Sequence, residues 1–212
     1  MPGKERQTTI TTYTGKRFDP VHPDPDLIDI RDIAHALSLI CRGNGQVRTF
    51  YSVGQHCIAC AREAETRGYP PRLALACLLH DAGECYLSDV PSPFKRVLPD
   101  YRAYENRLLE LIYRRYLGSP LSDKEQSDLD GIDHAMLDRD LACLLGETQA
   151  EKPDLLTRPD YTVRPFERVE QEFLTLFRRL AGAVRETGKG EPAHTESRYV
   201  HEADREKGEG RA

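Results

Sequence analysis

An apolar run that ends in ionisable side chains is the feature that most constrains how this chain can fold. Residues 73–79, LALACLL, are apolar on every face of a helix, so they are expected at the centre of the fold. His80 and Asp81 follow directly, and Glu84 comes three residues after Asp81. Because burying such groups without partners costs several kcal/mol for each ion, we expect this helix end to hold them for a chemical purpose.

Helical patterns on both sides of this run predict an all-α fold. Apolar side chains recur at helical spacing after Asp29 or Asp32, either of which could cap a helix, and the glycines of GNG at 43–45 end that segment. Caps, prolines and glycines mark further helices, which are expected over residues 52–68, 69–84, 101–118, 122–146 and 165–186. The sequence therefore predicts one helical bundle of five to six main helices.

The ends of the chain differ from this helical region in their composition. Residues 1–27 are polar and punctuated by proline, and they are expected to form an N-terminal arm that is either extended or folded as a short hairpin. Residues 28–186 form the predicted domain. Residues 187–212 carry both signs of charge and no periodic apolar face, so a disordered polar tail is expected there.

Composition excludes some classes of partner. The formal net charge is −5, so there is no general basic surface for a nucleic acid polymer, and a phosphate-bearing ligand needs a local site or a metal ion. No window approaches the ~20 apolar residues of a membrane span, and residues 1–10 lack the apolar segment of a secretory signal. We expect a cytoplasmic protein whose partner is a small molecule and not a membrane.

The six cysteines are expected to be reduced thiols, most of them packed in helices as small apolar side chains. Cys57 and Cys60 form a CxxC pattern, but no second pair follows at the spacing of a zinc site. The pattern is therefore interpreted as two residues on one helix face. It is not taken as a metal or redox motif.

The groups after the apolar run have the spacing of a metal site. His80 and Glu84 are four residues apart and Asp81 and Glu84 three, which places them on one face of a helix. His56 near one helix start and Asp133 within another helix supply further candidates. Imidazole and carboxylate groups bind divalent ions, and a carboxylate that does not bind the ion can transfer protons. The pattern predicts a site for one or two metal ions.

Three segments make this pattern specific. FYSVGQH at 50–56, LLHDAGECYLSDVPSPFK at 78–95 and IDHAMLDRDL at 132–141 resemble the HD-domain phosphohydrolases. The resemblance is to the branch that holds bacterial 5′-deoxynucleotidases and phage deoxynucleoside triphosphohydrolases, and it covers roughly residues 28–145. It implies an HD-domain helical bundle.

The resemblance also implies a role for each residue of the pattern. His56, His80, Asp81 and Asp133 match the ligands of a divalent metal ion, which could be Mn²⁺, Co²⁺, Mg²⁺ or Zn²⁺. Glu84 matches the acid or base that acts on the attacking water or the leaving oxygen.

Four more residues are implied on the substrate side. Asp89 matches a carboxylate behind the metal ligands or beside the sugar, and Lys95 matches a lysine that contacts phosphate. Arg42 lies where the family places a phosphate-binding arginine. Relatives usually carry a bulky aromatic residue next to it, whereas this chain has Gly43, so Arg48 is an alternative for that role.

The function implied is hydrolysis of phosphate esters or anhydrides of (deoxy)nucleotides. Either a monophosphate releases inorganic phosphate, or a triphosphate is attacked at its α-phosphorus and releases triphosphate. The alternative is a non-catalytic, metal-containing module that binds nucleotides; hydrolysis of signalling nucleotides is less favoured, because the companion motif of the cyclic-dinucleotide enzymes is missing. The family often forms dimers or rings, and the amphipathic helix over 101–117 could form an interface, so a homo-oligomer is expected.

Two groups of ionisable residues receive no functional role. His35 is expected to be a packed histidine on its helix. A solvated acidic face is expected for the four remaining aspartates of the helix that carries Asp133, namely Asp128, Asp130, Asp138 and Asp140.

Overall fold

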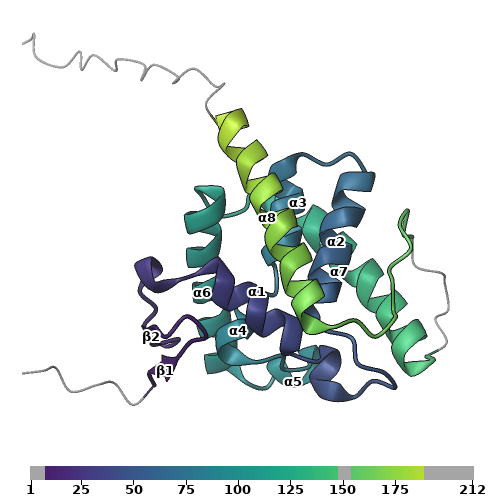
Figure 1. The fold of residues 1–212 in the computed structure, drawn as a ribbon, viewed down its shortest axis with the longest axis horizontal. Coiled ribbons are helices and arrows are strands. Elements are labelled where there is room, and N and C mark those ends of the chain that lie inside the picture. The colour runs from purple at the N-terminus through teal and green to yellow at the C-terminus, as the bar shows by residue number, and fades with distance from the viewer. Residues whose placement is uncertain (1–7, 148–153, 189–212) are drawn as a thin grey trace, which may run out of the picture.

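Helices α2 and α3 lie at the centre of the fold, and the other long helices pack around them (Figure 1). The computed structural model describes residues 8–147 and 154–188. Every residue of α3 from Leu73 to Leu79 is buried, because this helix contacts α2, α6, α7 and α8. The apolar run therefore has the central place that its composition predicts.

Within these described ranges the helices are much longer than the strands. The long helices are α1 (Ile30–Leu39), α2 (Val53–Thr66), α3 (Pro71–Leu79), α6 (Pro99–Leu117), α7 (Asp123–Asp140) and α8 (Phe166–Gly188). Short turns of helix are η1 (Pro25–Leu27), η2 (Arg42–Gly45), α4 (Glu84–Leu87), α5 (Ser92–Lys95) and the π-helical η3 (Leu141–Leu145). The prediction of an all-α bundle with five to six main helices is confirmed.

Part of the N-terminal arm is a small hairpin docked on α1. Strands β1 (Ile10–Thr11) and β2 (Arg17–Phe18) pair antiparallel, and Phe18 is fully buried. Thr14 donates two hydrogen bonds to the carboxylate of Asp32, from its backbone nitrogen at 2.7 Å and from its hydroxyl at 3.0 Å. Tyr13 stacks on His35 with ring centroids 3.6 Å apart, so His35 is packed as predicted. Of the two forms expected for the arm, the structure has the hairpin.

The helix predicted over residues 69–84 is shorter than expected. Helix α3 ends at Leu79, and the chain continues through tighter turns, in which Ala82 N donates to Leu79 O at 2.9 Å and Glu84 N donates to Asp81 O at 3.0 Å. The imidazole Nδ1 of His80 lies 2.8 Å from Cys77 O, the carbonyl that residue 81 would use if the helix continued. The side chain replaces the backbone donor, and the α-helix ends there.

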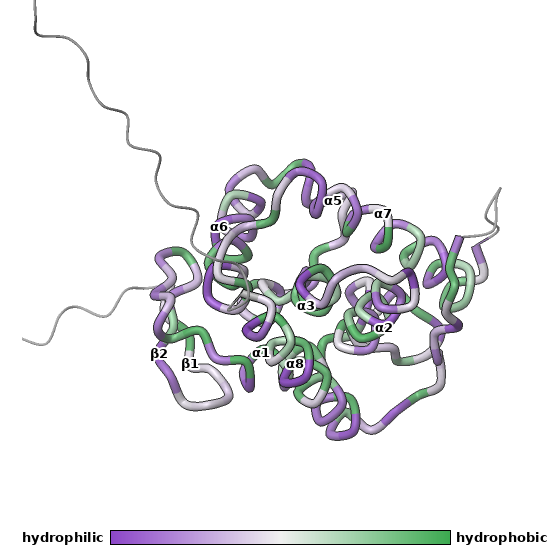
Figure 2. Tube along the Cα trace, turned by 90° about the horizontal axis from the view of Figure 1, so that it is seen from above, coloured by the Kyte–Doolittle hydropathy of each residue, from purple (hydrophilic) through white to green (hydrophobic). Residues whose placement is uncertain are grey.

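Helix α8 closes the bundle against α1 and α3. Its buried side chains include Val169, Phe173 and Leu180, and Figure 2 shows apolar residues gathered where these helices meet. Helix α8 ends at Gly188, just beyond the predicted start of the polar tail at 187. The rest of that tail, like residues 1–7 of the arm, lies outside the described residues. No helix in the described ranges is both long and apolar enough to cross a membrane.

Candidate metal centre

The N-terminal turn of α2 positions the first imidazole. Ser52 and Gln55 form a reciprocal cap, since Gln55 N donates to Ser52 Oγ at 3.1 Å and Ser52 N donates to Gln55 Oε1 at 3.2 Å. His56 follows one residue later and is fully buried. Its Nδ1 donates to Asp140 Oδ2 at 2.8 Å. In the neutral ring with its proton on Nδ1, Nε2 offers the lone pair that a metal ion requires. Without an ion, burial disfavours protonation, but Asp140 and Asp133 help to raise the pKa of His56.

The turn after α3 positions the second imidazole in the same way. His80 Nδ1 donates to the carbonyl of Cys77, which can only accept, so a neutral ring would present the lone pair of Nε2 to the centre. This Nε2 atom is buried and has no hydrogen-bond partner among the described residues. A buried polar atom without a partner is costly, and a metal ion would satisfy it.

The ligand atoms of the four residues predicted to bind metal meet at one place. His56 Nε2 lies 3.0 Å from Asp133 Oδ1 and 4.0 Å from Asp81 Oδ2. His80 Nε2 lies 3.3 Å from Asp81 Oδ2 and 3.4 Å from Asp133 Oδ1. Bonds of about 2.0–2.2 Å to one ion place neighbouring ligand atoms about 2.8–3.6 Å apart. Three of the four distances fall in that range, and His56, His80 and Asp133 each have a ligand atom within 4.8 Å of the other two. These three fit a single divalent ion, and Asp81 lies nearest to it on the side of His80.

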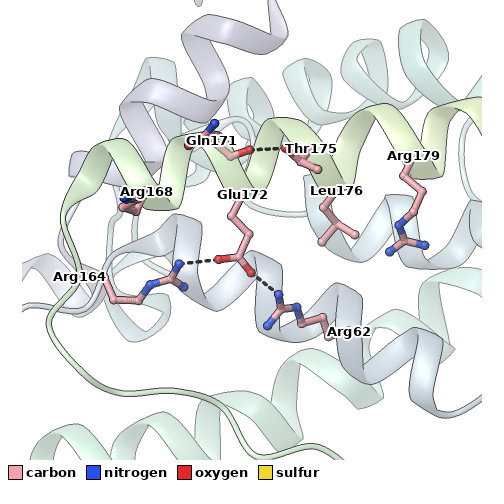
Figure 3. A pocket seen from close by; sticks show the side chains of 8 residues that line it. All are labelled: Arg62, Arg164, Arg168, Gln171, Glu172, Thr175, Leu176 and Arg179. Atoms are coloured by element: carbon pink, nitrogen blue, oxygen red, sulfur yellow. Dashed lines mark hydrogen bonds and ion pairs between the residues drawn. The ribbon is translucent and has the colours of Figure 1, made fainter.

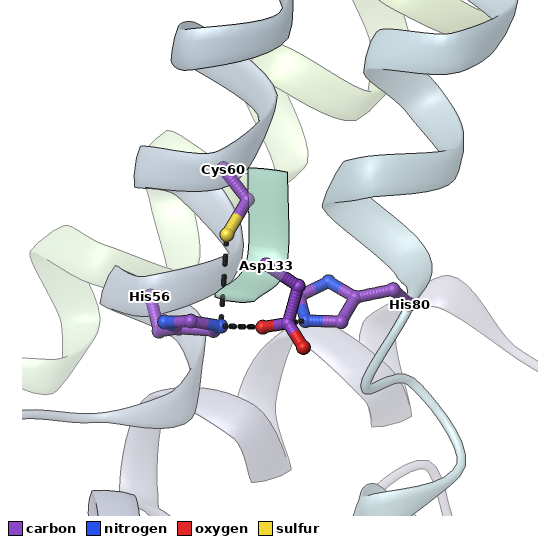
Figure 4. Close-up of side chains that lie close together, drawn as sticks. All are labelled: His56, Cys60, His80 and Asp133. Atoms are coloured by element: carbon purple, nitrogen blue, oxygen red, sulfur yellow. Dashed lines mark hydrogen bonds and ion pairs between the residues drawn. The ribbon is translucent and has the colours of Figure 1, made fainter. Parts of the chain in front are cut away.

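Three separate elements bring these atoms together: α2, the turn after α3, and α7. Figure 4 shows the imidazoles of His56 and His80 on either side of the carboxylate of Asp133. Burial disfavours ionised aspartates, but hydrogen bonds and positive charge from the two imidazoles outweigh it and lower the pKa values of Asp81 and Asp133; Arg42 adds to the effect at Asp81. Both carboxylates are therefore available as anionic ligands at neutral pH.

Of the two candidate arginines, Arg42 contacts the centre. Its Nη1 donates to Asp81 Oδ2 at 3.2 Å and its Nη2 to His56 Nε2 at 3.1 Å. A guanidinium group can only donate, so the second contact agrees with a lone pair on His56 Nε2. Arg48 is directed elsewhere, since its backbone nitrogen bonds Leu144 O at 3.1 Å and its guanidinium covers Gly146 so closely that a side chain there would collide with it.

A buried acid lies beside the centre. Glu84 is 3% exposed, and its Oε1 accepts a hydrogen bond from Lys95 Nζ at 3.2 Å, whereas Oε2 has no partner among the described residues. Burial, followed by the charges of Asp81 and Asp89, raises the pKa of Glu84 well above its ordinary value of 4.5. A carboxyl group whose pKa is raised in this way holds a proton more readily than an ordinary glutamate and is suited to proton transfer.

Lys95 and Asp89 extend the site away from the ligands. Lys95 Nζ also binds Glu105 Oε1 at 2.5 Å, and although burial opposes it, the two glutamates raise the pKa of Lys95 so that it stays charged. Asp89 Oδ2 accepts from Gly43 N at 2.8 Å and thereby ties down the turn that carries Arg42. The structure thus gathers every predicted site residue except Arg48 in one region.

Comparison with known proteins places the chain in a family. No protein-family model matches it. It is 41% identical over 107 residues to the uncharacterized protein YfdR of Escherichia coli K12, a match that covers 50% of this chain and 57% of YfdR. It is 31% identical over 154 residues to the uncharacterized protein RCAP_rcc00048 of Rhodobacter capsulatus, covering 69% of this chain and 78% of that protein. The chain belongs to the family of this Rhodobacter protein.

The match to the first of these relatives is partial. The chain spans little more than half the length of YfdR, 57% of it.

Asp140 is the main residue of the centre that the sequence analysis assigned wrongly. A solvated acidic face was expected for it, but Asp140 is only 2% exposed. Its carboxylate accepts from His56 Nδ1, from Arg42 Nε at 3.4 Å and from the hydroxyl of Tyr161 at 2.9 Å. A signal was present, because Asp140 lies seven residues after Asp133 and so on the same face of α7.

The other aspartates of α7 agree better with the expected acidic face. Asp130 and Asp138 are exposed, while Asp128 is half-buried and paired with Lys124 at 2.6 Å. Asp140 differs from them because its side chain lies on the buried side of α7.

Cys60 was predicted to be only a packed thiol, and all six cysteines, which lie in the described ranges, are free thiols. Yet the Sγ atom of Cys60 lies 3.6 Å from His56 Nε2, inside the centre. The spacing of His56 and Cys60, four residues apart on one helix, was the available signal.

A basic hollow between α2 and α8 is a separate feature. Figure 3 shows Glu172 directed between Arg62 and Arg164, with which it forms ion pairs. Arg168 and Arg179 line the same hollow, and Arg179 pairs with Glu65 at 2.6 Å. Its lining residues include no imidazole, so it does not resemble the metal centre.

Proposed function

We propose that the chain is an HD-superfamily, metal-dependent phosphohydrolase that acts on (deoxy)nucleotides. The observation that carries the proposal is the meeting of four ligand atoms, from His56, His80, Asp81 and Asp133, beside the buried acid Glu84. A structural metal site would not need a proton-transfer group next to it. The combination supports hydrolysis over a purely structural role for the metal.

The donor set suits some divalent ions better than others. Two imidazoles and two carboxylates fit Mn²⁺, Co²⁺ or Zn²⁺, whereas Mg²⁺ prefers oxygen ligands only. When bound, such an ion would polarise a phosphoryl oxygen and lower the pKa of a water molecule. The remaining chemistry comes from the side chains around the ligands.

Each of these side chains has a role in phosphate-ester hydrolysis that its contacts support. Glu84, with its raised pKa, would take a proton from the attacking water or give one to the leaving oxygen. Lys95 and Arg42 would bind the non-bridging phosphate oxygens, which explains how an acidic protein could hold a nucleotide. Asp89 would hold the turn at Gly43 in place, next to the position proposed for the sugar of the nucleotide.

Two reactions remain within this proposal. Attack on a monophosphate would release inorganic phosphate, and attack on the α-phosphorus of a triphosphate would release triphosphate. Both need the same ligands and the same acid, and they differ in how many phosphates must be bound beyond the metal.

Product analysis separates the two reactions. The purified protein is incubated with Mn²⁺ and either dAMP or dATP, and the expected product is phosphate from the first or triphosphate from the second. His80→Ala is expected to abolish metal binding and turnover together, whereas His134→Ala, an exposed imidazole on α7, serves as the matched control and is expected to retain both.

A non-catalytic nucleotide-binding module is the alternative. It would show saturable nucleotide binding, no product from either substrate, and no response of binding to Glu84→Gln. That combination of results would overturn the proposal. Homo-oligomer formation, which the resemblance implies, and a cytoplasmic location, which the composition of the sequence suggests, are further predictions, and sedimentation analysis tests the first.

A further inference from the structure

We propose that Cys60 is an alternative metal ligand, so that the centre holds two overlapping ligand sets. In the first set, a harder ion such as Mn²⁺ is bound by His56, His80, Asp81 and Asp133. In the second, a thiophilic ion such as Zn²⁺ is bound by Cys60 in place of Asp81. This inference rests on the metal centre of the proposed function, and it does not require that the centre hydrolyses nucleotides.

The position of the sulfur atom carries the argument. Cys60 lies four residues after His56 on α2, so both side chains leave the same face of the helix. Figure 4 shows the sulfur of Cys60 directed toward the imidazole of His56. One ligand atom from each of His56, Cys60, His80 and Asp133 lies within 4.8 Å of the other three.

The distances fit a tetrahedral ion. Bonds of about 2.3 Å to sulfur and about 2.0–2.1 Å to nitrogen, at a tetrahedral angle, place the two ligand atoms about 3.5–3.6 Å apart. Cys60 Sγ and His56 Nε2 are 3.6 Å apart. His80 Nε2 and Asp133 Oδ1, at 3.4 Å, are also separated as tetrahedral ligands would be.

An independent observation points to a ligand at the same place. The Nε2 atom of His80 is buried, faces the centre, and has no hydrogen-bond partner among the described residues. Its imidazole is only 7% exposed, so the atom faces the interior of the centre and is remote from bulk solvent. Cys60 itself is 1% exposed and is therefore protected from other reactions of thiols.

The second cysteine of the CxxC pattern does not fit as well. Cys57 groups with His80 and Asp81 but not with His56 or Asp133. An ion bound by Cys57 would therefore lose two of its four ligands, His56 and Asp133. Asp81, by contrast, can be released by the ion, because Arg42 lies 3.2 Å away and supplies an alternative partner.

The two ligand sets have different consequences for water. Four protein ligands in a tetrahedral arrangement leave no open position, which is the property of structural zinc sites. Binding through sulfur would form the metal–sulfur bond and release the thiol proton to solvent. We therefore expect Zn²⁺ to inhibit a centre that is active with Mn²⁺.

The spectrum of the cobalt-loaded protein tests the inference, with Co²⁺ as a coloured substitute for Zn²⁺. Thiolate ligation is expected to produce an intense near-ultraviolet charge-transfer band in the wild-type protein. The band is expected to disappear in Cys60→Ser and to persist in Cys57→Ser, which changes the neighbouring thiol on the same helix. Absence of the band from wild-type protein at full cobalt occupancy would overturn the inference without any variant, as would its loss from Cys57→Ser alone.

Metal affinity provides a second measurement. Cys60→Ser is expected to weaken Zn²⁺ binding by at least about 100-fold, the upper end of the loss caused by removing an outer hydrogen-bond partner. Mn²⁺ binding should change little. Equal losses for both ions would contradict two ligand sets. Failure of hydrolysis would leave the cobalt band intact, whereas failure of the band would leave manganese-dependent hydrolysis intact, so the two proposals fail separately.

Discussion

The orientation of each imidazole depends on the partner of its Nδ1 atom. For His80 the partner is the backbone carbonyl of Cys77, which no substitution removes. For His56 the partner is a side chain, the carboxylate of Asp140. A carboxylate in this position fixes the ring and increases the electron density on Nε2. Asp140 is therefore the residue through which the strength of metal binding can be changed without touching a ligand.

Removal of that carboxylate should weaken metal binding. Asp140→Ala is expected to raise the metal dissociation constant by about 10–100-fold, because His56 loses the group that orients it. Titration calorimetry with Mn²⁺ measures this directly. Asp138→Ala, an exposed aspartate of the same helix, is the matched control and should bind as the wild type does. Equal affinities for the two variants would remove Asp140 from its positioning role.

Removal of the proton-transfer group should separate metal binding from turnover. Glu84→Gln preserves the shape of the side chain and one accepting oxygen but cannot ionise, so kcat is expected to fall by about 10²–10⁴-fold. Metal content should stay at the wild-type value, because Glu84 contacts Lys95 and not the ligands. The paired measurements are metal analysis and steady-state kinetics on the same preparation. A rate near that of the wild type would exclude Glu84 as the acid or base.

The sequence predicted part of the centre at this scale and missed another part. The meeting of His56, His80 and Asp133 could be expected from a motif spread over three segments. Asp140 and Cys60 were missed because each was judged by its own surroundings in the sequence. Aspartate is usually solvated and cysteine usually packs as an apolar side chain. Asp140 and Cys60 depart from these tendencies because each contacts His56 in the folded protein, and the local sequence does not show such contacts.

At the level of elements, a close approach of α1 and α2 sets the position of His56. A methyl group added at Gly54 would lie 3.1 Å from Leu37 O and 3.3 Å from Ser38 N, both backbone atoms of α1. Contacts of this length are tighter than normal packing, so the helices would have to move apart. Glycine at this position is therefore a packing requirement.

Substitution of this glycine should destabilise the fold. Gly54→Ala is expected to lower the free energy of unfolding by about 1–3 kcal/mol, the usual cost of overpacking. Gly131→Ala, on the exposed side of α7, has nothing within 4 Å of the added methyl group among the described residues and should raise stability by about 0.5–1 kcal/mol. Urea denaturation of both variants gives the comparison, and a loss of similar size in both would contradict the close approach.

Helix starts were easier to predict than helix ends. Ser52 and Ser122 each form the reciprocal cap that the local sequence suggests, because the donor, the acceptor and the spacing all lie within four residues. The end of α3 at Leu79 was predicted wrongly. It depends on the bond between His80 and Cys77, which competes with the helical pattern of the apolar run.

At the scale of the whole molecule, one buried carboxylate joins the connecting segment before α8 to α2. Glu63 is fully buried and accepts hydrogen bonds from Leu156 N at 2.9 Å and Thr157 N at 2.8 Å. Arg67 on the same helix donates a further bond at 2.8 Å. Nothing local to Glu63 in the sequence indicates a partner more than ninety residues away, so this contact could not be predicted.

This contact should make stability depend on pH. Burial alone would raise the pKa of Glu63, but its hydrogen bonds to Thr157, Leu156 and Arg67 outweigh it and lower the pKa below 4.5, the ordinary value. A carboxyl group with a lower pKa in the folded state stabilises the protein above its unfolded pKa. That stabilisation is lost as the pH falls through the folded pKa.

Glu63→Gln should therefore cost most at neutral pH. The expected loss is about 1.5–3 kcal/mol at pH 7, the net value of hydrogen bonds to a charged group. The loss should shrink in acid. Glu63 of the wild type is then protonated, so it no longer contributes a charged acceptor, and its hydrogen-bonding groups resemble those of glutamine. Urea denaturation at neutral and acidic pH measures both differences, with Glu167→Gln, an exposed glutamate of α8, as the control. A difference between wild type and Glu63→Gln that stays constant across this range would show that the contact does not depend on the charge of Glu63.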